Sequence, residues 1–118
     1  MDRGSVELLR RACDLVRGGW SQDADARSAE GAEVQPWQET AVAWSLLGAL
    51  VAALEERADH GRDLPLDHLA AALHALAEHI DDDSLTNWND APVRTQDDVI
   101  NTLEAAATSA AAQLSDGR

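Results

Sequence analysis

The pattern of apolar and polar positions predicts four main helices, near residues 5–17, 38–59, 65–80 and 96–114. In the first, third and last of them, apolar residues recur at intervals of three and four, which places them on one face of a helix. The stripes are Val6, Leu9, Cys13 and Val16; Leu66, Leu69, Leu73, Leu76 and Ile80; and Val99, Ile100, Leu103, Ala107, Ala110 and Leu114. Each helix is therefore expected to bury one face in a shared core.

The second predicted helix differs from the others because it has no polar face. From Ala41 to Leu54 only Ser45 interrupts a run of apolar residues and glycine. A helix that is apolar all round is either buried in protein or spans a membrane, and this run is shorter than the ~20 residues that a bilayer requires. We therefore expect a buried central helix. A glycine inside a helix costs about 1 kcal/mol of stability relative to alanine. We attribute the presence of Gly48 to the close approach of a neighbouring helix.

The segment between the first two helices has no helical period. Residues 20–36 (WSQDADARSAEGAEVQP) are small and acidic, and they favour a loop or a short β-hairpin that turns at Glu30 and Gly31. A disordered surface loop is the alternative. We expect a single all-α domain over residues 1–118, a small four-helix domain around the buried central helix, with a loop or hairpin at 21–35 and a tail at 115–118.

Residues typical of helix ends support these boundaries. Gly18 and Gly19 follow the first helix, Pro36 and Thr40 mark the entry to the second, His60 and Gly61 mark its exit, and Pro65 opens the third. The third helix should end near Ile80, because the aspartates at 81–83 are unfavourable at the negative end of the helix dipole. Asp83 or Ser84 can then cap a short turn. Thr95 and Asp98 match a capping box at the start of the last helix.

The charge of the chain restricts its partners. It carries 22 acidic residues against nine basic ones, all of them arginine, for a formal net charge of −13. This negative field repels phosphate backbones, so we expect no direct binding to nucleic acid. The acids are concentrated in residues 21–40 and 81–98. The first residues lack the long apolar run of a signal peptide, and without a membrane span a cytoplasmic protein is expected.

Candidate catalytic and metal-binding groups are few. The absence of lysine and tyrosine removes common nucleophiles and proton donors, and no nucleophile–base pair, glycine-rich phosphate loop or CxxC motif is present. Asp81, Asp83 and Asp90 do not match the calcium loop of an EF-hand. Cys13 lies on an apolar stripe and is predicted to be a buried small hydrophobe. We expect no catalytic residue, no metal site and no cofactor.

Four tryptophans, in a chain without phenylalanine or tyrosine, are the most unusual feature. We predict that Trp20, Trp44 and Trp88 clamp the loop and the short turn onto the second helix, because a buried indole covers a large apolar area while its N–H seeks an acceptor. The alternative is a platform on which a small molecule stacks, with Gln22 and Asp90 as polar anchors.

The segment 86–98 (TNWNDAPVRTQDD) concentrates polar side chains between the short turn and the last helix. The segment is predicted to form a hydrogen-bonded corner, in which Asp90 and Arg94 can pair. The residues of this corner are Asn87, Asn89, Asp90, Arg94, Thr95 and Gln96. The alternative is a polar recognition site or a surface that contacts a partner.

These residues fall in four blocks: Gly-Gly-Trp-x-Gln (18–22), Ala-Arg-x-x-x-Gly (26–31), Ala-Val-x-Trp-x-x-x-Gly-Ala-Leu (41–50) and Trp-Asn-Asp-x-x-x-Arg-Thr-Gln-x-x-Val (88–99). Their order resembles a family of small uncharacterised proteins of bacteria, chiefly actinobacteria, and their phages. The resemblance implies that 20–36 is a defined loop or hairpin, and it implies no activity. It leads us to expect a glycine where Asp23 stands and an aromatic where Asp25 stands. The motif positions are Trp20, Gln22, Trp44, Trp88, Asn89, Asp90, Arg94 and Thr95.

Three classes of function agree with these features. The first is a non-enzymatic interaction or accessory protein whose acidic surface meets a basic patch on a protein partner, or on a second copy of itself in a homodimer. The second is a small-molecule binder that uses a tryptophan-lined pocket. The third is an acidic mimic of DNA that occupies a nucleic-acid-binding enzyme. An enzyme is the least favoured class.

Overall fold

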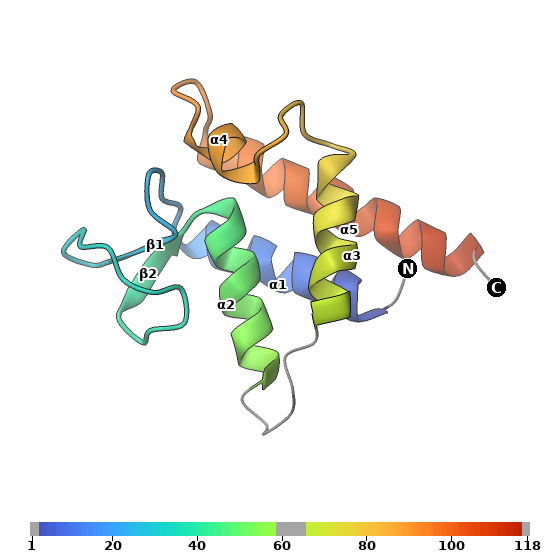
Figure 1. Cartoon of the computed structure of the whole chain (residues 1–118), viewed down its shortest axis with the longest axis horizontal. Coiled ribbons are helices and arrows are strands. Elements are labelled where there is room, and N and C mark those ends of the chain that lie inside the picture. The colour runs from blue at the N-terminus through green and yellow to red at the C-terminus, as the bar shows by residue number, and fades with distance from the viewer. Residues whose placement is uncertain (1–2, 59–65, 117–118) are drawn as a thin grey trace.

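The computed structural model describes residues 3–58 and 66–116 and shows a mostly helical domain with one small β-sheet (Figure 1). The elements, in chain order, are α1 (Arg3–Gly18), β1 (Ala26–Ser28), β2 (Ala41–Trp44), α2 (Leu46–Ala58), α3 (Leu66–Ala77), α4 (Leu85–Asp90) and α5 (Gln96–Asp116). The helical class is confirmed. The described residues contain five helices rather than four, because the short turn forms a separate helix, α4.

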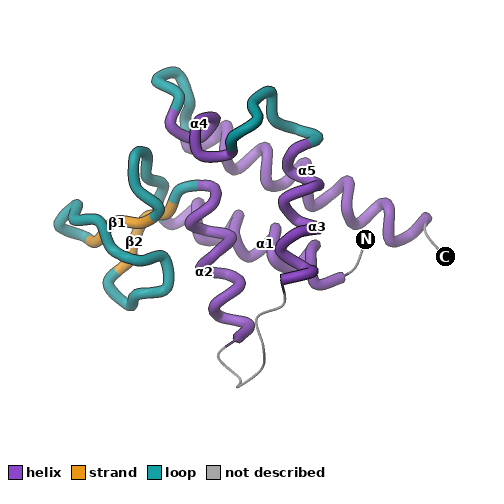
Figure 2. Tube along the Cα trace, in the orientation of Figure 1, coloured by secondary structure: helices purple, strands orange, loops and turns teal. Residues whose placement is uncertain are grey.

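The central helix is α1, not α2. Helix α1 packs against α5, α2 and α3 and also contacts β2, and Figure 2 shows it passing behind α2 and α3. Nine of its residues are buried, Leu8, Leu9 and Val16 completely. Helix α2 buries much of its surface but leaves Leu47 and Val51 partly exposed. The prediction that the second helix lies at the centre is therefore wrong, because α1 packs its broad apolar face against three other helices.

The predicted helix over 38–59 is also wrong in its first part. Residues 36–40 form turns and Ala41–Trp44 form strand β2, so that α2 begins only at Leu46. A short apolar run does not distinguish a strand from a buried helix by its period. Pairing with β1 decides between them here.

Ser45 marks the true start of α2. Its hydroxyl accepts a hydrogen bond from the backbone N–H of Gly48 at 2.9 Å, and its carbonyl accepts one from the backbone N–H of Ala49 at 2.8 Å. A serine that accepts these two bonds is a helix N-cap. The one polar residue in the apolar run is thus the boundary between strand and helix.

Strands β1 and β2 form a two-stranded antiparallel sheet in which Ala26 lies opposite Trp44 and Ser28 opposite Ala41, with an irregular step beside Ser28. The chain between them turns first at Ser28–Gly31, where the backbone N–H of Gly31 donates to the Ser28 carbonyl at 2.9 Å. Gly31 has a φ of 85°, in the left-handed region that favours glycine. The predicted turn at Glu30 and Gly31 is confirmed.

Several predicted helix ends are also confirmed. Helix α1 ends at Gly18. The Ser84 hydroxyl caps α4 by accepting a hydrogen bond from the Asn87 backbone N–H at 3.2 Å. Thr95 and Asp98 form a reciprocal capping box: the Thr95 hydroxyl accepts from the Asp98 N–H at 3.1 Å, and the Asp98 carboxylate accepts from the Thr95 N–H at 3.0 Å.

The C-terminal ends of two helices differ from the prediction. Helix α3 ends at Ala77, three residues before the predicted end at Ile80. Helix α5 continues to Asp116, so the predicted tail at 115–118 is helical at its first two positions. The helix-end signals at His60, Gly61 and Pro65 lie outside the described residues.

Gly48 permits a close approach, but not of a helix. A Cβ atom on Gly48 would lie 1.9 Å from the carbonyl oxygen of Asp25, in the loop before β1. That same carbonyl accepts a hydrogen bond from the backbone N–H of Ser45 at 3.1 Å. The glycine therefore lets the hairpin segment rest on the first turn of α2, and our attribution to a helix crossing is wrong.

Within residues 3–58 and 66–116, no helix combines the length and the apolar character needed to cross a bilayer.

Candidate functional site

The predicted site residues at the end of α4 are organised around Asn89, which is 1% exposed. Its Oδ1 accepts hydrogen bonds from the indole N–H of Trp20 at 2.8 Å and from the backbone N–H of Leu46 at 3.0 Å. Its Nδ2 donates to the Ser21 carbonyl at 3.0 Å and to the Asp90 carboxylate at 2.9 Å. All four hydrogen bonds available to the amide are thus formed, and they join α4 to the start of α2 and to the segment after α1.

Gln22 and Asp90 extend this network. The side-chain amide of Gln22 donates to the carbonyls of Asn89 and Ala91, each at 3.0 Å. The Asp90 carboxylate accepts from the backbone N–H of Asp23 at 2.9 Å. Segment 20–23 is therefore held against α4 by both side chains and backbone.

Asp23 has a φ of 65°, and it is the one residue other than glycine with a positive φ in the described part of the chain. The family resemblance leads us to expect glycine at this position. Aspartate is among the few residues that tolerate the left-handed region, at a cost in strain. The expectation therefore has a physical basis in the backbone conformation found here.

Arg94 does not pair with Asp90. Its guanidinium lies over the indole of Trp88, 3.9 Å from the ring centroid, and its Nε donates to the Trp88 carbonyl at 2.8 Å. The predicted ion pair across the turn is thus replaced by a cation–π contact. Trp88 itself is buried in the core. Thr95 acts in the capping box of α5.

Trp44 belongs to a different environment. Its backbone bonds to both neighbours of Trp20, since its N–H donates to the Gly19 carbonyl at 3.0 Å and its carbonyl accepts from the Ser21 N–H at 3.1 Å. Its indole N–H, however, donates to the Pro36 carbonyl at 2.9 Å. Trp44 lines a cavity of about 200 Å³ together with Trp37, Glu55 and other residues.

The structure thus brings Trp20, Gln22, Asn89 and Asp90 into one hydrogen-bonded network and places Trp88 and Arg94 beside it, whereas the Trp44 indole N–H donates elsewhere, to Pro36. None of the cavities that we describe is lined by both Trp20 and Trp88. Both the clamping role of the three tryptophans and the stacking platform therefore stay predictions.

The acidic segments carry carboxylates that are not neutralised. Segment 21–40 has five acids and segment 81–98 has six, and no described cation forms an ion pair with any of them. The arginines of these segments are used elsewhere: Arg27 donates to the carbonyls of Gly31 and Gln22, and Arg94 lies over Trp88. The ion pairs that we find use Arg11 and Arg17 of α1.

Three cavities follow one another along this surface. One of about 240 Å³ is lined by Asp23, Asp25, Glu33 and Asp90, among others. A second, of about 340 Å³, shares Asp25 and Glu33 with it. The second also shares Gln38 with the tryptophan-lined cavity. Gln38 therefore links the acidic surface to the cavity that Trp37 and Trp44 line.

Other reactive groups offer little chemistry. Within the described residues, no group of three or more His, Cys, Asp and Glu side chains is arranged to hold a metal ion. Cys13 is 4% exposed, and burial raises the pKa of its thiol. Its Sγ lies 3.8 Å from the Ile100 carbonyl. The predicted buried small hydrophobe is confirmed.

Sequence reasoning missed two sets of residues. Ser21 and Ser45 connect the hairpin segment to the α4 network and to α2, and the isolated serine in an apolar run was the signal for the second of them. Trp37 and Glu55 line the tryptophan cavity. They are separated by a strand and most of a helix, and no sequence pattern joins them.

Comparison with protein families finds a match over residues 2–109 to a family of unknown function (DUF6197). The match covers most of the chain, which therefore belongs to that family. Comparison with curated proteins and with solved structures finds no match.

Proposed function

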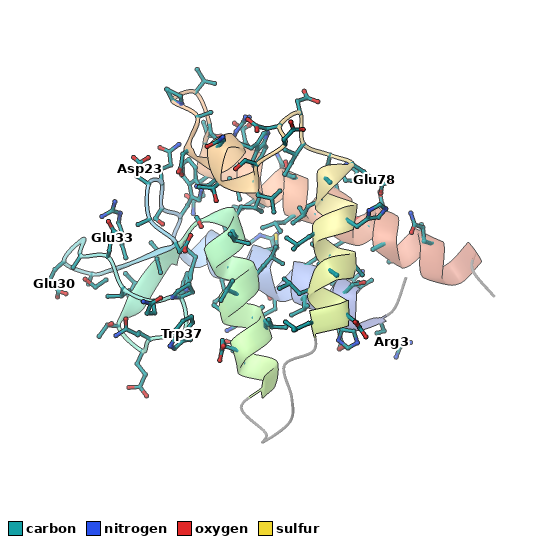
Figure 3. All side chains as sticks on the ribbon, viewed as in Figure 1. Arg3, Asp23, Glu30, Glu33, Trp37 and Glu78 are labelled. Atoms are coloured by element: carbon teal, nitrogen blue, oxygen red, sulfur yellow. The ribbon has the colours of Figure 1, made fainter. Side chains whose placement is uncertain are left out.

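We propose that this member of the family is a non-enzymatic interaction protein whose acidic surface binds a basic surface on a protein partner. The observation that carries the proposal is the set of carboxylates in 21–40 and 81–98, none of which is in an ion pair with a described cation. Figure 3 shows Asp23, Glu30 and Glu33 on the loops at the hairpin end of the molecule. A surface of one sign attracts a partner of the opposite sign and speeds its association.

The rigidity of this surface supports the proposal. The loop that carries Asp23 is fixed to Asp90, the last residue of α4, by the bond between the Asp23 N–H and the Asp90 carboxylate. Helix α4 is fixed in turn to α2 through Asn89. Charges held on an ordered scaffold lose less conformational entropy on binding than charges on a disordered segment.

A pair of variants with equal net charge tests the proposal. Glu30→Gln with Glu33→Gln removes two charges from the acidic surface, and Asp67→Asn with Glu78→Gln removes two exposed charges from and beside α3. Proteins captured from a lysate of the source cells would be quantified by mass spectrometry for wild type and both variants, at low and high salt. We expect the specific partner to be lost at high salt.

We expect the partner, once purified, to bind the Glu30/Glu33 variant roughly 2- to 30-fold more weakly, since an exposed charge pair contributes about 0.2–1 kcal/mol. The Asp67/Glu78 variant should bind as wild type does. Equal weakening by both variants would show a general field effect and contradict a defined surface. Sedimentation of the isolated protein tests whether the partner is a second copy. A partner set dominated by DNA-binding enzymes that DNA displaces would instead favour the DNA mimic.

A further inference from the structure

The cavity between Trp37 and Trp44 has the composition of a receptor for one organic cation. It is lined by Leu15, Pro36, Trp37, Gln38, Trp44, Ala52, Glu55 and Glu56. Indole faces attract cations through the ring quadrupole, and a carboxylate beside them adds a charge-assisted hydrogen bond. At about 200 Å³ the cavity is smaller than the roughly 300–1,000 Å³ of sites for drug-sized ligands. It therefore suits a single side chain rather than a cofactor.

The two glutamates of this cavity are not equivalent. Glu56 forms a two-point ion pair with Arg11, at 2.8 and 2.9 Å, so its charge is already compensated. Glu55 is half-buried at the cavity wall and has no hydrogen bond or ion pair with any described side chain. The carboxylate available to an incoming cation is therefore that of Glu55.

The indole rings of Trp44 and Trp37 also differ in how they are held. The Trp44 indole is fixed by its hydrogen bond to the Pro36 carbonyl at 2.9 Å. Trp37 is 53% exposed, although an indole is among the most costly side chains to leave in water. Figure 3 shows Trp37 beside α2 at the hairpin end of the molecule. One ring is a fixed wall and the other is an exposed surface that an incoming side chain can cover.

We propose that this cavity binds an arginine side chain of the basic protein partner, with the guanidinium stacked against Trp37 and Trp44 and hydrogen-bonded to Glu55. This inference rests on the proposed function, because it supplies the partner's arginine. Arginine fits better than lysine, since a planar guanidinium stacks on rings and bonds a carboxylate at two points. The shared residue Gln38 makes the cavity continuous with the acidic surface, so one partner can contact both.

The test uses the whole chain and a short probe, acetyl-Gly-Arg-Gly-amide, with the isosteric citrulline peptide as the uncharged control. Binding is followed through the four tryptophan indole N–H signals in NMR spectra, assigned with single Trp→Phe variants. We expect the arginine peptide to shift the Trp37 and Trp44 signals and to leave Trp20 and Trp88 unchanged. Citrulline should bind at least about fivefold more weakly, because it lacks the charge that both contacts need.

Two variants test whether the arginine peptide binds in this cavity. Glu55→Gln and Trp37→Leu should each weaken the arginine peptide about threefold or more, whereas Glu30→Gln, which removes an equal charge at the hairpin tip, should not. Equal effects of Glu55→Gln and Glu30→Gln, or equal binding of citrulline and arginine, would overturn the cavity as the binding site. Tighter binding of free arginine than of the peptide would overturn the assignment to a protein.

The outcomes also separate this inference from the proposed function. Partner binding that depends on Glu30 and Glu33 but is unchanged in Glu55→Gln and Trp37→Leu would overturn the arginine site and leave the acidic surface standing. Arginine-peptide binding at the cavity, with a partner indifferent to Glu30 and Glu33, would support the cavity and contradict the surface. The peptide measurement needs no knowledge of the partner.

Discussion

The side-chain oxygen of Asn89 lies 3.0 Å from the backbone nitrogen of Leu46, the first residue of α2, so a residue of α4 caps a helix that begins 43 positions earlier. The same oxygen accepts the indole N–H of Trp20. A single amide thus satisfies two donors from different parts of the chain, and it does so at a buried position where an unsatisfied donor is costly.

Asn89→Ala should therefore lower the free energy of unfolding by about 3 kcal/mol or more, because the Trp20 and Leu46 donors and the Ser21 carbonyl would lose their partner and each buried orphan costs about 1–3 kcal/mol. Denaturant unfolding followed by tryptophan fluorescence measures this. Asn87→Ala, two positions away on the exposed side of α4, is the matched control and should change stability by less than about 0.5 kcal/mol. Comparable losses in the two variants would contradict the role of Asn89.

Gly48→Ala should destabilise the protein by about 1–3 kcal/mol, although alanine is the better helix former, because the new methyl group would collide with the Asp25 carbonyl and push the hairpin segment off α2. Gly18→Ala is the control. A Cβ atom at position 18 would meet no atom within 4 Å. The higher helix propensity of alanine should therefore raise the free energy of unfolding by up to about 1 kcal/mol. Thermal unfolding of both variants is the measurement, and a stabilised Gly48→Ala protein would show that the contact is not rigid.

Asp23→Gly should leave stability unchanged or raise it by up to about 1 kcal/mol, because relief of the left-handed backbone is partly offset by the greater freedom of glycine in the unfolded chain. Asp23→Ala should be the less stable of the two, since alanine does not tolerate a φ of 65°. Asp25→Gly provides the comparison at an ordinary φ in the same loop, where only the entropy cost applies. Chemical denaturation of the three variants should place Asp25→Gly below Asp23→Gly.

Stability should fall as the pH rises above the ordinary pKa of a thiol. Burial raises the pKa of Cys13 in the folded protein, so the unfolded chain loses its thiol proton at a lower pH than the folded one. The protonated thiol contributes its full stabilisation below the pKa that Cys13 has in the unfolded chain, and this contribution is lost as the pH rises through the pKa of the folded protein. The chain has no lysine or tyrosine to titrate in this range. The fall in stability with rising pH should therefore be largely absent from the Cys13→Ala variant. Denaturant unfolding at a series of pH values measures it. An equal fall in the variant would show that another group causes it.

Much of the helical framework could be predicted because its signals are local. The stripe Val6, Leu9, Cys13 and Val16 and the Thr95–Asp98 box depend on neighbours within a few residues, and both predictions are confirmed. The strand at 41–44 could not, since AVAW is apolar in either conformation. Its actual state depends on β1, which lies about fifteen residues earlier.

The candidate site was predictable only in part, for a related reason. The residues Trp20, Gln22, Asn89 and Asp90 were identified as candidates, but their mutual bonds span 67 to 69 positions and no local pattern encodes them. The expected pair of Asp90 and Arg94 was local and wrong. The face of Trp88 and its carbonyl both lay within reach of the guanidinium, and together they hold it.

The packing of α1 against α5 has a consequence for the rate of folding. The ion pair between Arg17 and Glu104 joins residues 87 positions apart, and α1 and α5 pack against each other along the same interface. A long loop must close before such contacts form, so folding should be slower than that of a helical bundle whose neighbouring helices are consecutive in the chain.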